Sequence, residues 1–517
     1  MAIPPGALAQ AVAIAVAPMT APPAGAIPGT AYAFGPDGTT FASPAVVTIA
    51  YDPALLPAGV AEADLELALL VGAAWTPVAG SAVDAAADAV SGTTSHFSSF
   101  ALVPRAPRPP PAIARASAGA GGVAGDGDSP PLTALGRPSV SRDGRLVAFA
   151  SSAANLVAAD GNSVADVFVR DLVSEATVRV SVTSAGEEGR APSRYPVISG
   201  DGRYVVFATQ ANLDPADTTS QVVWDLYRHD LSSSTTELVD VDAGGTIQSQ
   251  AFAPAPAVSG DGRFVAWRDF ATPRILVKDM LSGALDPVAV PVVPTPLGDV
   301  WDPLVSDDGQ VVAFVSSHAH QAGQANVYPS VFALDRARGT VERIALGTTL
   351  DMIQPTIGMS ASGDVIAYAT RSPQLFPDDN ATWDVYAHVR SAATNPWLVS
   401  VGAAGDASGG PAFFGSGAPF VSADGSTVAY QSSATNLVTG IAGAGDVPQV
   451  FVRATFGGRT YQLSACGGLA GNATSGDPAL SGDGLVAVFW SAADNLLGSP
   501  GACSGDANGK VDVFAAR

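Results

Sequence analysis

Basic residues and long apolar runs are scarce in this sequence. Its 517 residues include 25 Lys+Arg against 47 Asp+Glu, which gives a formal net charge of −22. Nucleic-acid binding requires clustered positive charge, so this acidic balance excludes that class of function. Lysine occurs only at Lys278 and Lys510, and no heptad pattern is sustained, which argues against coiled coils. No stretch approaches ~20 uninterrupted apolar residues, so the sequence predicts no transmembrane helix.

Cysteine is almost absent as well, since only Cys466 and Cys503 are present. Two cysteines can form one disulfide or remain free thiols, but alone they do not make a zinc site. Residues 1–6 lack the basic region of a signal peptide, and no charge precedes the apolar run at 11–17. The residues themselves therefore do not establish export.

Apolar and turn-forming residues are what the sequence has in quantity. Hydrophobic residues make up 47% of the chain and charged residues 14%, so there is ample material for a core. The 55 Gly and 40 Pro are typical of many short strands joined by turns.

One sequence phrase recurs along most of the chain. It consists of a Pro, a short apolar run, a Ser, a Gly-containing turn and a second apolar run that ends in an aromatic residue. A second phrase, an apolar run with a polar residue at its start, follows each copy. The first phrase begins at Pro138, Pro196, Pro256, Pro303, Pro355, Pro419 and Pro478. The second phrase occupies Asp166–Asp171, Asp225–Asp230, Arg274–Asp279, Ser330–Asp335, Asp384–His388, Gln449–Arg453 and Asp512–Ala515.

Each repeat predicts four short strands, which we call a to d. An Asp-Gly pair, such as the one at Asp143 and Gly144, separates strands a and b, because glycine accepts the positive φ that a tight hairpin needs. Four-stranded sheets repeated around an axis are the blades of a β-propeller, which protects its edges by closing on itself. The alternatives, a linear β-solenoid or a string of separate hairpins, fit repeats with two tight hairpins less well.

The ends of the repeat array predict how the propeller closes. The seventh repeat stops at Arg517, directly after strand c, whereas residues 112–117, before the first repeat, resemble a displaced strand d. Adding this segment to the last blade would complete the ring and remove an exposed edge. We therefore expect an all-β chain in which residues 112–517 form a seven-bladed β-propeller closed by an N-terminal strand.

The first 103 residues have a different pattern. Short strands bounded by turns, such as 44–51 and 95–101, predict a small β-sandwich module over residues 1–103. Residues 104–111 read Pro-Arg-Ala-Pro-Arg-Pro-Pro-Pro, which predicts a semi-rigid polyproline linker between the two domains.

The repeats resemble the TolB-like, WD-related propeller repeats of bacterial proteins. The matching residues are the Ser-x-Asp-Gly-Arg-x-Val-Ala-Phe phrase of strands a and b, the Asn-Leu-Val that begins at Asn155, and the strand-c phrase at 166–171. TolB itself is associated with six blades, whereas this chain counts seven. Residues 1–103 are similar to the second half of bacterial ZU-type β-sandwich modules. Both families are commonly extracytoplasmic, so the resemblance implies an extracellular or periplasmic protein.

Two loops between strands b and c carry alternating oxygen side chains around a small turn residue. Ca²⁺ takes six to eight oxygen ligands, so these loops are candidate calcium sites. The alternative is that the Asp and Asn side chains cap turns by bonding their own backbone. The candidate ligands are Asp160, Asn162 and Asp166 in blade 1, and Asp506, Asn508 and Asp512 in blade 7.

Two further pairs of residues are candidates for a structural or metal-binding role. Cys466 follows strand d of blade 6 and Cys503 lies in the b–c loop of blade 7, so both fall on one face of adjacent blades, and a disulfide is expected in an exported protein. His318 and His320, in the b–c loop of blade 4, could hold a metal or form a solvated pair. No Gly-x-Ser-x-Gly, His-Glu-x-x-His or P-loop motif is present.

The distribution of charge along the repeats predicts a propeller with one acidic face. Acidic residues concentrate in the b–c and d–a loops, which share one face of a propeller, here called the loop face, whereas many arginines lie in or beside the tight hairpins of the opposite, hairpin face. We expect a non-enzymatic, exported, monomeric protein that binds a protein or glycan partner on the acidic loop face, with calcium as the one candidate cofactor. The alternative is a hydrolase or lyase with a site in the central funnel. A deep funnel with free carboxylates or a histidine would favour the enzyme, and a plugged one would favour binding.

Overall fold

The computed structural model describes most of the chain. It divides into two compact units, one formed mainly by residues 1–109 and the other by most of residues 110–517. No helix among the described residues is long and apolar enough to cross a membrane. The residues outside the description are 1–2, 4–6, 9–11, 24–25, 57–61, 63–64, 72–73, 79–80, 85–86, 105–111, 131–135, 249, 273, 289–298, 302, 319, 321–327, 348–352, 372–381, 393–394, 404–414, 442–446, 456–458, 500–501, 505 and 507.

The first unit contains two antiparallel sheets with a core between them. One sheet has the order β1-β2-β8-β4-β5 and the other the order β3-β7-β6. Phe34, Val47, Leu67 and Phe100 belong to one buried apolar cluster that draws on both sheets. The expected linker, apart from Pro104 at the end of β8, lies outside the described residues. The strands are β1 (Ala15–Pro18), β2 (Tyr32–Gly35), β3 (Thr40–Ala50), β4 (Leu65–Val71), β5 (Ala74–Pro77), β6 (Ala82–Asp84), β7 (Ala89–His96) and β8 (Ser99–Pro104).

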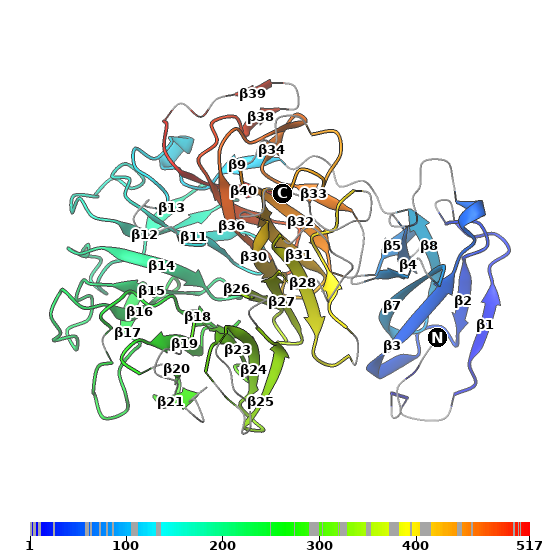
Figure 1. Cartoon of the computed structure of the whole chain (residues 1–517), viewed down its shortest axis with the longest axis horizontal. Helices are drawn as coiled ribbons and strands as arrows, with labels where there is room; N and C mark the ends of the chain where they lie inside the picture. The colour runs from blue at the N-terminus through cyan, green and yellow to red at the C-terminus, as the bar shows by residue number, and fades with distance from the viewer. Residues whose placement is uncertain are drawn as a thin grey trace. The chain divides into compact units, whose positions relative to one another are not determined.

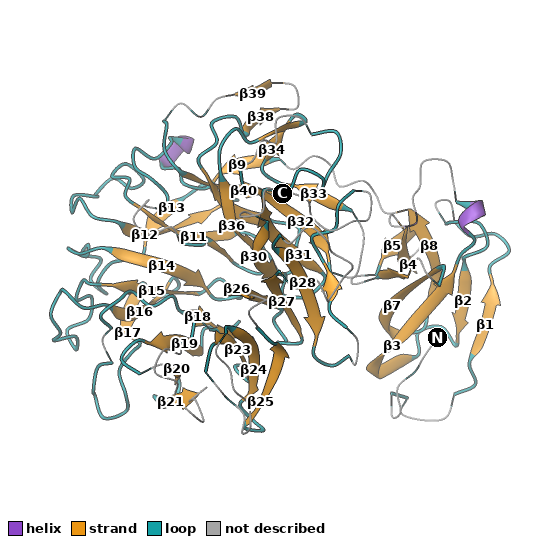
Figure 2. Ribbon diagram, viewed as in Figure 1, coloured by secondary structure: helices purple, strands orange, loops and turns teal. Residues whose placement is uncertain are grey.

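The second unit is a β-propeller of four-stranded antiparallel blades (Figures 1 and 2). Each blade of the described chain contains strands a to d in sequence order, with the exchange at the closure described below. Blades 1 to 3 are β10 (Ser139–Val140), β11 (Leu146–Ser151), β12 (Asp166–Asp171) and β13 (Thr177–Arg179); β14 (Ser193–Ile198), β15 (Tyr204–Thr209), β16 (Asp225–Asp230) and β17 (Thr235–Leu238); and β18 (Ala257–Val258), β19 (Phe264–Asp269), β20 (Arg274–Asp279) and β21 (Leu285–Val288).

Blades 4 to 7 follow the same plan, so the sequence prediction of a seven-bladed, all-β propeller is confirmed. Blades 4 and 5 are β22 (Leu304–Val305), β23 (Val311–Ser316), β24 (Ser330–Asp335) and β25 (Thr340–Ala345), then β26 (Ile353–Met359), β27 (Val365–Thr370), β28 (Asp384–Val389) and β29 (Trp397–Leu398). Blades 6 and 7 are β30 (Ser416–Val421), β31 (Thr427–Ser432), β32 (Gln449–Ala454) and β33 (Thr460–Gln462), then β36 (Ser475–Leu480), β37 (Ala487–Ser491), β40 (Asp512–Ala516) and β9 (Ile113–Arg115).

The last blade is closed by a strand from the other end of the propeller. β9 pairs antiparallel with β40, with Ala114 opposite Ala515 and Arg115 opposite Phe514. Figure 1 shows the cyan β9 beside the red β40. The outer edge of β40 would otherwise expose unpaired backbone groups, so this exchange satisfies them and joins the first blade to the last.

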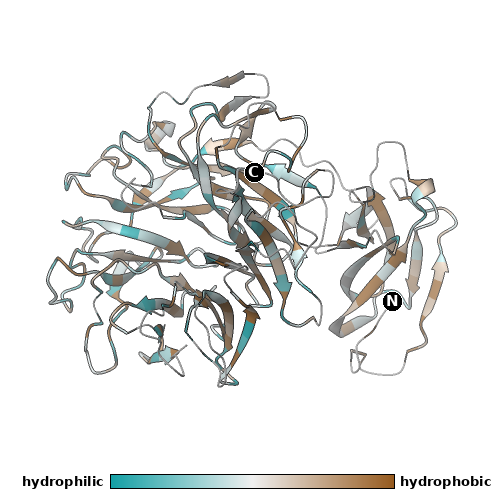
Figure 3. Cartoon of the chain, viewed as in Figure 1, coloured by the Kyte–Doolittle hydropathy of each residue, from teal (hydrophilic) through white to brown (hydrophobic). Residues whose placement is uncertain are grey.

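The tight turn between strands a and b is built from the recurrent Ser-x-Asp-Gly sequence. In blade 1, Ser141 Oγ donates to Asp143 Oδ1 at 2.5 Å and accepts from the Leu146 amide at 2.9 Å, while Gly144 takes a φ of 71°. The Ser–Asp contact recurs in blades 2, 3, 4, 6 and 7. The serine and aspartate of the repeat are therefore turn-forming residues. Apolar residues of the flanking strands form buried clusters between neighbouring blades, and Figure 3 shows the hydrophobic colouring of the strands.

Candidate functional site

A channel on the propeller axis is lined by residues of all seven blades. It has a volume of about 410 Å³, within the range of small-molecule sites, and residues of every strand a line it. Most of the wall is apolar, formed by proline and aliphatic side chains such as Pro196, Pro256 and Val305. The charged side chains among its described lining residues are Arg137, Arg142, Asp307 and Asp477, and no histidine is found among them.

Arg137 lies in the part of the channel nearest the start of strand a. Its guanidinium donates to the carbonyls of Ala418 at 3.4 Å and Pro419 at 3.3 Å, and stacks 5.3 Å from the centre of the Phe420 ring. Burial lowers the pKa of Arg137, and the charge of Asp477 opposes that shift. The arginine thus ties blade 1 to blade 6 across the channel.

Asp477 belongs to a row of strained residues at the same level. Asp477, Tyr195 and Ala418 have φ values of 47°, 53° and 47°, and each directly precedes the proline of its strand a at a β-bulge. Non-glycine residues with positive φ cost energy and persist only where surrounding structure fixes them. Trp490 Nε1 donates to Asp477 Oδ2 at 2.9 Å, so the bulge of blade 7 is fixed by a side-chain bond.

At the other end, the a–b turns bring Arg142 of blade 1 and Asp307 of blade 4 into an ion pair across the axis. Both side chains keep substantial exposure, 47% and 36%. The sequence carries a signal for this pair, because Arg142 and Asp307 are the charged residues at the variable position of the Ser-x-Asp-Gly sequence. The pairing was not predicted from it.

The candidate calcium loop of blade 1 surrounds an arginine. Arg179 Nη1 lies 3.2 Å from Asp160 Oδ1, 3.5 Å from Asp166 Oδ2 and 2.9 Å from Glu188 Oε2. Asn162 Nδ2 donates to Asp166 Oδ2 at 2.7 Å, and Asn162 Oδ1 accepts from a backbone amide two residues on. Burial raises the pKa of Asp160 and of Asp166, and Arg179 opposes both shifts. The guanidinium supplies the positive charge that the sequence prediction assigned to calcium.

The candidate loop of blade 7 has the same construction. Arg115 Nη2 lies 2.5 Å from Asp506 Oδ1, and Arg115 Nε lies 3.2 Å from Asp512 Oδ2. Asn508 Nδ2 donates to Asp512 Oδ2 at 2.8 Å. Burial, with the neighbouring Asp506, raises the pKa of Asp512 to about 7. Since Arg115 comes from β9, this cluster lies on the closure of the propeller.

The arginines at the centre of these two clusters were missed at the sequence level. Arg115 and Arg179 occupy the same place in strand d, two residues before Ser117 and Ser181. Alignment of these two Arg-x-Ser sequences could have found them. In the described part of the chain, no group of three or more His, Cys, Asp or Glu residues is arranged to hold a metal ion.

The histidine pair of blade 4 is not solvated, which corrects that alternative. His318 is fully buried and His320 is 6% exposed. His320 Nε2 lies 2.8 Å from Ser316 Oγ, and its ring packs edge-on against Phe314 and Phe332. Burial, with the neighbouring His318, lowers the pKa of His320 to about 4, so the ring is neutral and part of the core.

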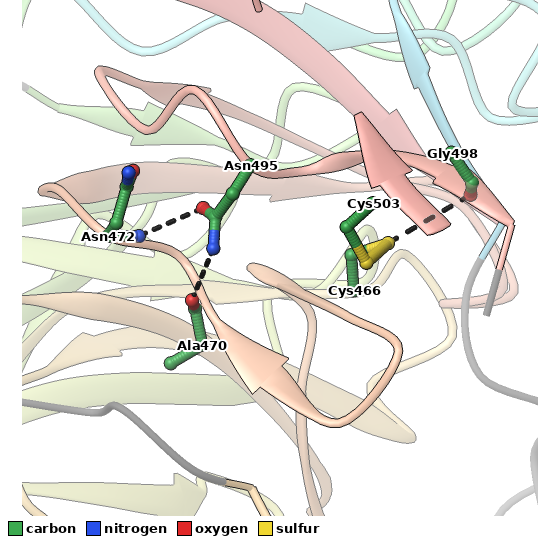
Figure 4. Close-up of a disulfide and its surroundings, with 6 residues drawn as sticks. All are labelled: Cys466, Ala470, Asn472, Asn495, Gly498 and Cys503. Carbon is green, nitrogen blue, oxygen red and sulfur yellow. Dashed lines mark hydrogen bonds between the residues drawn. A yellow bond between two sulfur atoms is a disulfide. The ribbon is translucent and has the colours of Figure 1, made fainter. Parts of the chain in front are cut away.

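Cys466 and Cys503 form a disulfide with a Cα–Cα distance of 5.9 Å (Figure 4). It joins β34 (Ala465–Cys466) to β39 (Ala502–Ser504), short strands that project from blades 6 and 7. Asn495 reinforces the same region, since its Nδ2 donates to the Ala470 carbonyl at 2.9 Å and its Oδ1 accepts from the Asn472 amide at 2.9 Å.

The arginines of the hairpin face are paired with carboxylates. Arg145, at the start of strand b, donates two hydrogen bonds to Asp171 at the end of strand c, at 3.0 and 2.6 Å. Arg203 with Asp230 and Arg263 with Asp279 repeat this arrangement in blades 2 and 3. These pairs hold the pKa of Asp171, Asp230 and Asp279 below the ordinary range, and they neutralise much of the positive charge expected on this face.

No family model and no curated protein matches the chain. Solved structures show its similarity to other β-propellers. An oligogalacturonate lyase from Vibrio parahaemolyticus has 12% identity and a TM-score of 0.45, with 76% of this chain and 91% of that chain covered. A protein described as TolB from Agrobacterium tumefaciens has 15% identity and a TM-score of 0.34, over 57% and 88%. The propeller domain of Myceliophteria thermophila Cps50 (Swd1) has 13% identity and a TM-score of 0.39, over 73% and 96%. The chain resembles these proteins in its propeller fold.

Proposed function

We propose that this chain is an exported, non-enzymatic binding protein that holds a protein or glycan partner on the loop face of its propeller. The main support is the state of the charged side chains in the channel. Arg142 pairs with Asp307, Arg137 donates to backbone carbonyls, and Asp477 accepts from Trp490. A general acid or base must reach its substrate to exchange a proton with it. These four side chains instead make their contacts within the protein, which supports a binding function over a catalytic one.

Export is part of the same proposal and has separate support. A disulfide such as Cys466–Cys503 persists in oxidising compartments and is rare in the cytosol. The TolB-like origin of the propeller and the ZU-type origin of the sandwich belong to this proposal too, on the sequence resemblance. Calcium is left out of it, because the guanidinium groups of Arg179 and Arg115 lie between the carboxylates of the two candidate loops.

The proposal is tested by binding and turnover measured on the same preparation. The purified chain is titrated with basic peptides, and with neutral and acidic oligosaccharides, at low and high salt. Glu187, an exposed residue of a d–a loop, is changed to Lys, and the exposed Glu175 of a c–d turn on the hairpin face is changed in the same way as a matched control.

Binding on the loop face predicts at least a threefold loss of peptide affinity for Glu187→Lys at low salt and little change for Glu175→Lys, because screened surface charges act over about 10 Å. A glycan partner would bind without turnover. Release of product from an oligosaccharide, with loss of that activity in Asp477→Asn, would instead establish the alternative, a hydrolase or lyase in the channel.

A further inference from the structure

The variable position of the Ser-x-Asp-Gly turn lies where the seven blades meet at one end of the channel. Five blades place a glycine or alanine there, blade 1 places Arg142 and blade 4 places Asp307. These residues line the same cavity in most blades. The full set is Arg142, Gly200, Gly260, Asp307, Ala361, Ala423 and Gly482.

The small residues leave the space that the ion pair fills. A Cβ atom built on Gly260 would lie 2.6 Å from Asp307 Oδ1, and one on Gly200 would lie 3.0 Å from Arg142 Nη2. A Cβ atom on Gly482 would overlap Arg142 Cγ. Larger side chains in these blades are thus excluded by the two charged side chains that cross the axis.

A ring of backbone hydrogen bonds links the same turns from blade to blade. The Arg142 amide donates to the Gly200 carbonyl at 2.9 Å, and the Gly482 amide donates to the Arg142 carbonyl at 2.8 Å. Between blades 3 and 4 no such bond joins the described residues Gly260 or Asp261 to Asp307. The other bonds of the ring are Asp201 to Gly260, Asp307 to Ala361, Ala361 to Ala423 and Asp424 to Gly482.

From this arrangement we infer that the Arg142–Asp307 ion pair is the floor of the channel. The pair crosses the axis from blade 1 to blade 4 and ends beside the one joint at which the backbone ring is open. It closes the hairpin end, so a ligand reaches the channel from the loop-face end, past Arg137. Both groups are partly exposed, and breaking the pair opens a second entrance without disturbing the blades. The inference concerns the form of the cavity and stands apart from the proposed binding function.

The test uses single cysteines at two depths, because the native cysteines are both in the disulfide and an introduced thiol is the only free one. Ala255→Cys probes the part of the channel before strand a of blade 3, and Val258→Cys probes the part next to the floor, directly before Ser259 of the turn. The exposed Ala337→Cys, in a c–d turn, reports the intrinsic reactivity of the reagent. Each is alkylated with a small methanethiosulfonate reagent.

With the floor intact, Val258→Cys should react at least tenfold more slowly than Ala255→Cys. We then add Arg142→Ala to each cysteine variant. This change should increase the alkylation rate of Val258→Cys at least tenfold and leave the rates of Ala255→Cys and Ala337→Cys unchanged. If the Arg142→Ala variant folds poorly, the milder Asp307→Asn replaces it. The inference is overturned if the two channel probes react equally fast in the parent protein. It is equally overturned if a folded floor variant, checked by circular dichroism, leaves the rate at Val258→Cys unaltered.

Discussion

Blades 1 and 7 place an arginine beside their buried aspartates, whereas blade 2 has a leucine in the place of that arginine. All three begin strand c with a fully or almost fully buried aspartate: Asp166, Asp512 and Asp225. In blades 1 and 7 a serine that follows strand d donates to this aspartate at 2.5 Å, and the last arginine of strand d lies within 3.5 Å of it. In blade 2 the serine is replaced by Asp240 and the arginine by Leu238, as the equivalent strand registers show.

The difference shows what a buried carboxyl group does without a basic partner. Asp240 is completely buried, and the hydrogen bonds that lower its pKa come from backbone groups rather than from a basic side chain. Burial, with the nearby charges of Asp225 and Asp217, raises the pKa of Asp240 well above the ordinary value. In blades 1 and 7 an arginine opposes the rise in pKa that burial causes, whereas no arginine takes that place in blade 2, which favours the neutral acid.

The largest expected effect comes from removing the arginine of a paired cluster. Arg179→Met leaves Asp160 and Asp166 buried without a counter-charge, and we expect a loss of about 3–5 kcal/mol in the free energy of unfolding, as for other broken buried ion pairs. Arg115→Met should cost a similar amount, because it also weakens the closure between β9 and β40. Denaturant unfolding followed by circular dichroism measures both.

Arg145→Met is the matched control for this prediction. Its side chain is 52% exposed and pairs with Asp171 in a geometry as good as that of the buried pairs. Water screens an exposed pair, so the loss should be much smaller than for Arg179→Met. Equal losses for the buried and exposed arginines would remove the distinction between paired clusters and surface pairs.

A smaller effect, of opposite sign, is expected when blade 2 is given the residue of the other blades. Asp240→Ser removes a buried acid that has no basic partner and restores a hydroxyl that can donate to Asp225, so we expect a gain of about 1–3 kcal/mol at pH 8. Because the folded-state pKa of Asp240 is raised, the parent protein loses stability as pH rises above the ordinary aspartate range. The gain should therefore shrink toward pH 4, and a gain independent of pH would contradict this account.

The sequence predicts the fold better than it predicts the side-chain contacts in the paired clusters of blades 1 and 7. The Ser-x-Asp-Gly turns and the strand-like segment at 112–117 carry local information, and both gave the correct blades and closure. For the loops of blades 1 and 7, the sequence shows the oxygen side chains and not the arginine that lies between them. Arg179 reaches Asp160 from another strand, and Asp307 reaches Arg142 across three blades. Such contacts depend on side-chain direction in the folded ring, which no local pattern encodes.

The smallest effect concerns Asp512 in the paired cluster of blade 7. Asp512 has a pKa of about 7 despite its contact with Arg115, so its protonated form is favoured by folding, and the parent protein should lose stability as pH rises from about 4 to about 7. Asp512→Asn imitates the protonated acid and keeps an acceptor for the Ser117 hydroxyl. We expect nearly equal stabilities of variant and parent at pH 5, and a modest advantage of the variant at pH 8, measured by thermal unfolding across this range. Burial also raises the pKa of Asp166 in blade 1, so Asp166→Asn should show a gain of the same sign. If the stability of Asp512→Asn relative to that of the parent instead falls between pH 5 and pH 8, the closure depends on a charged aspartate.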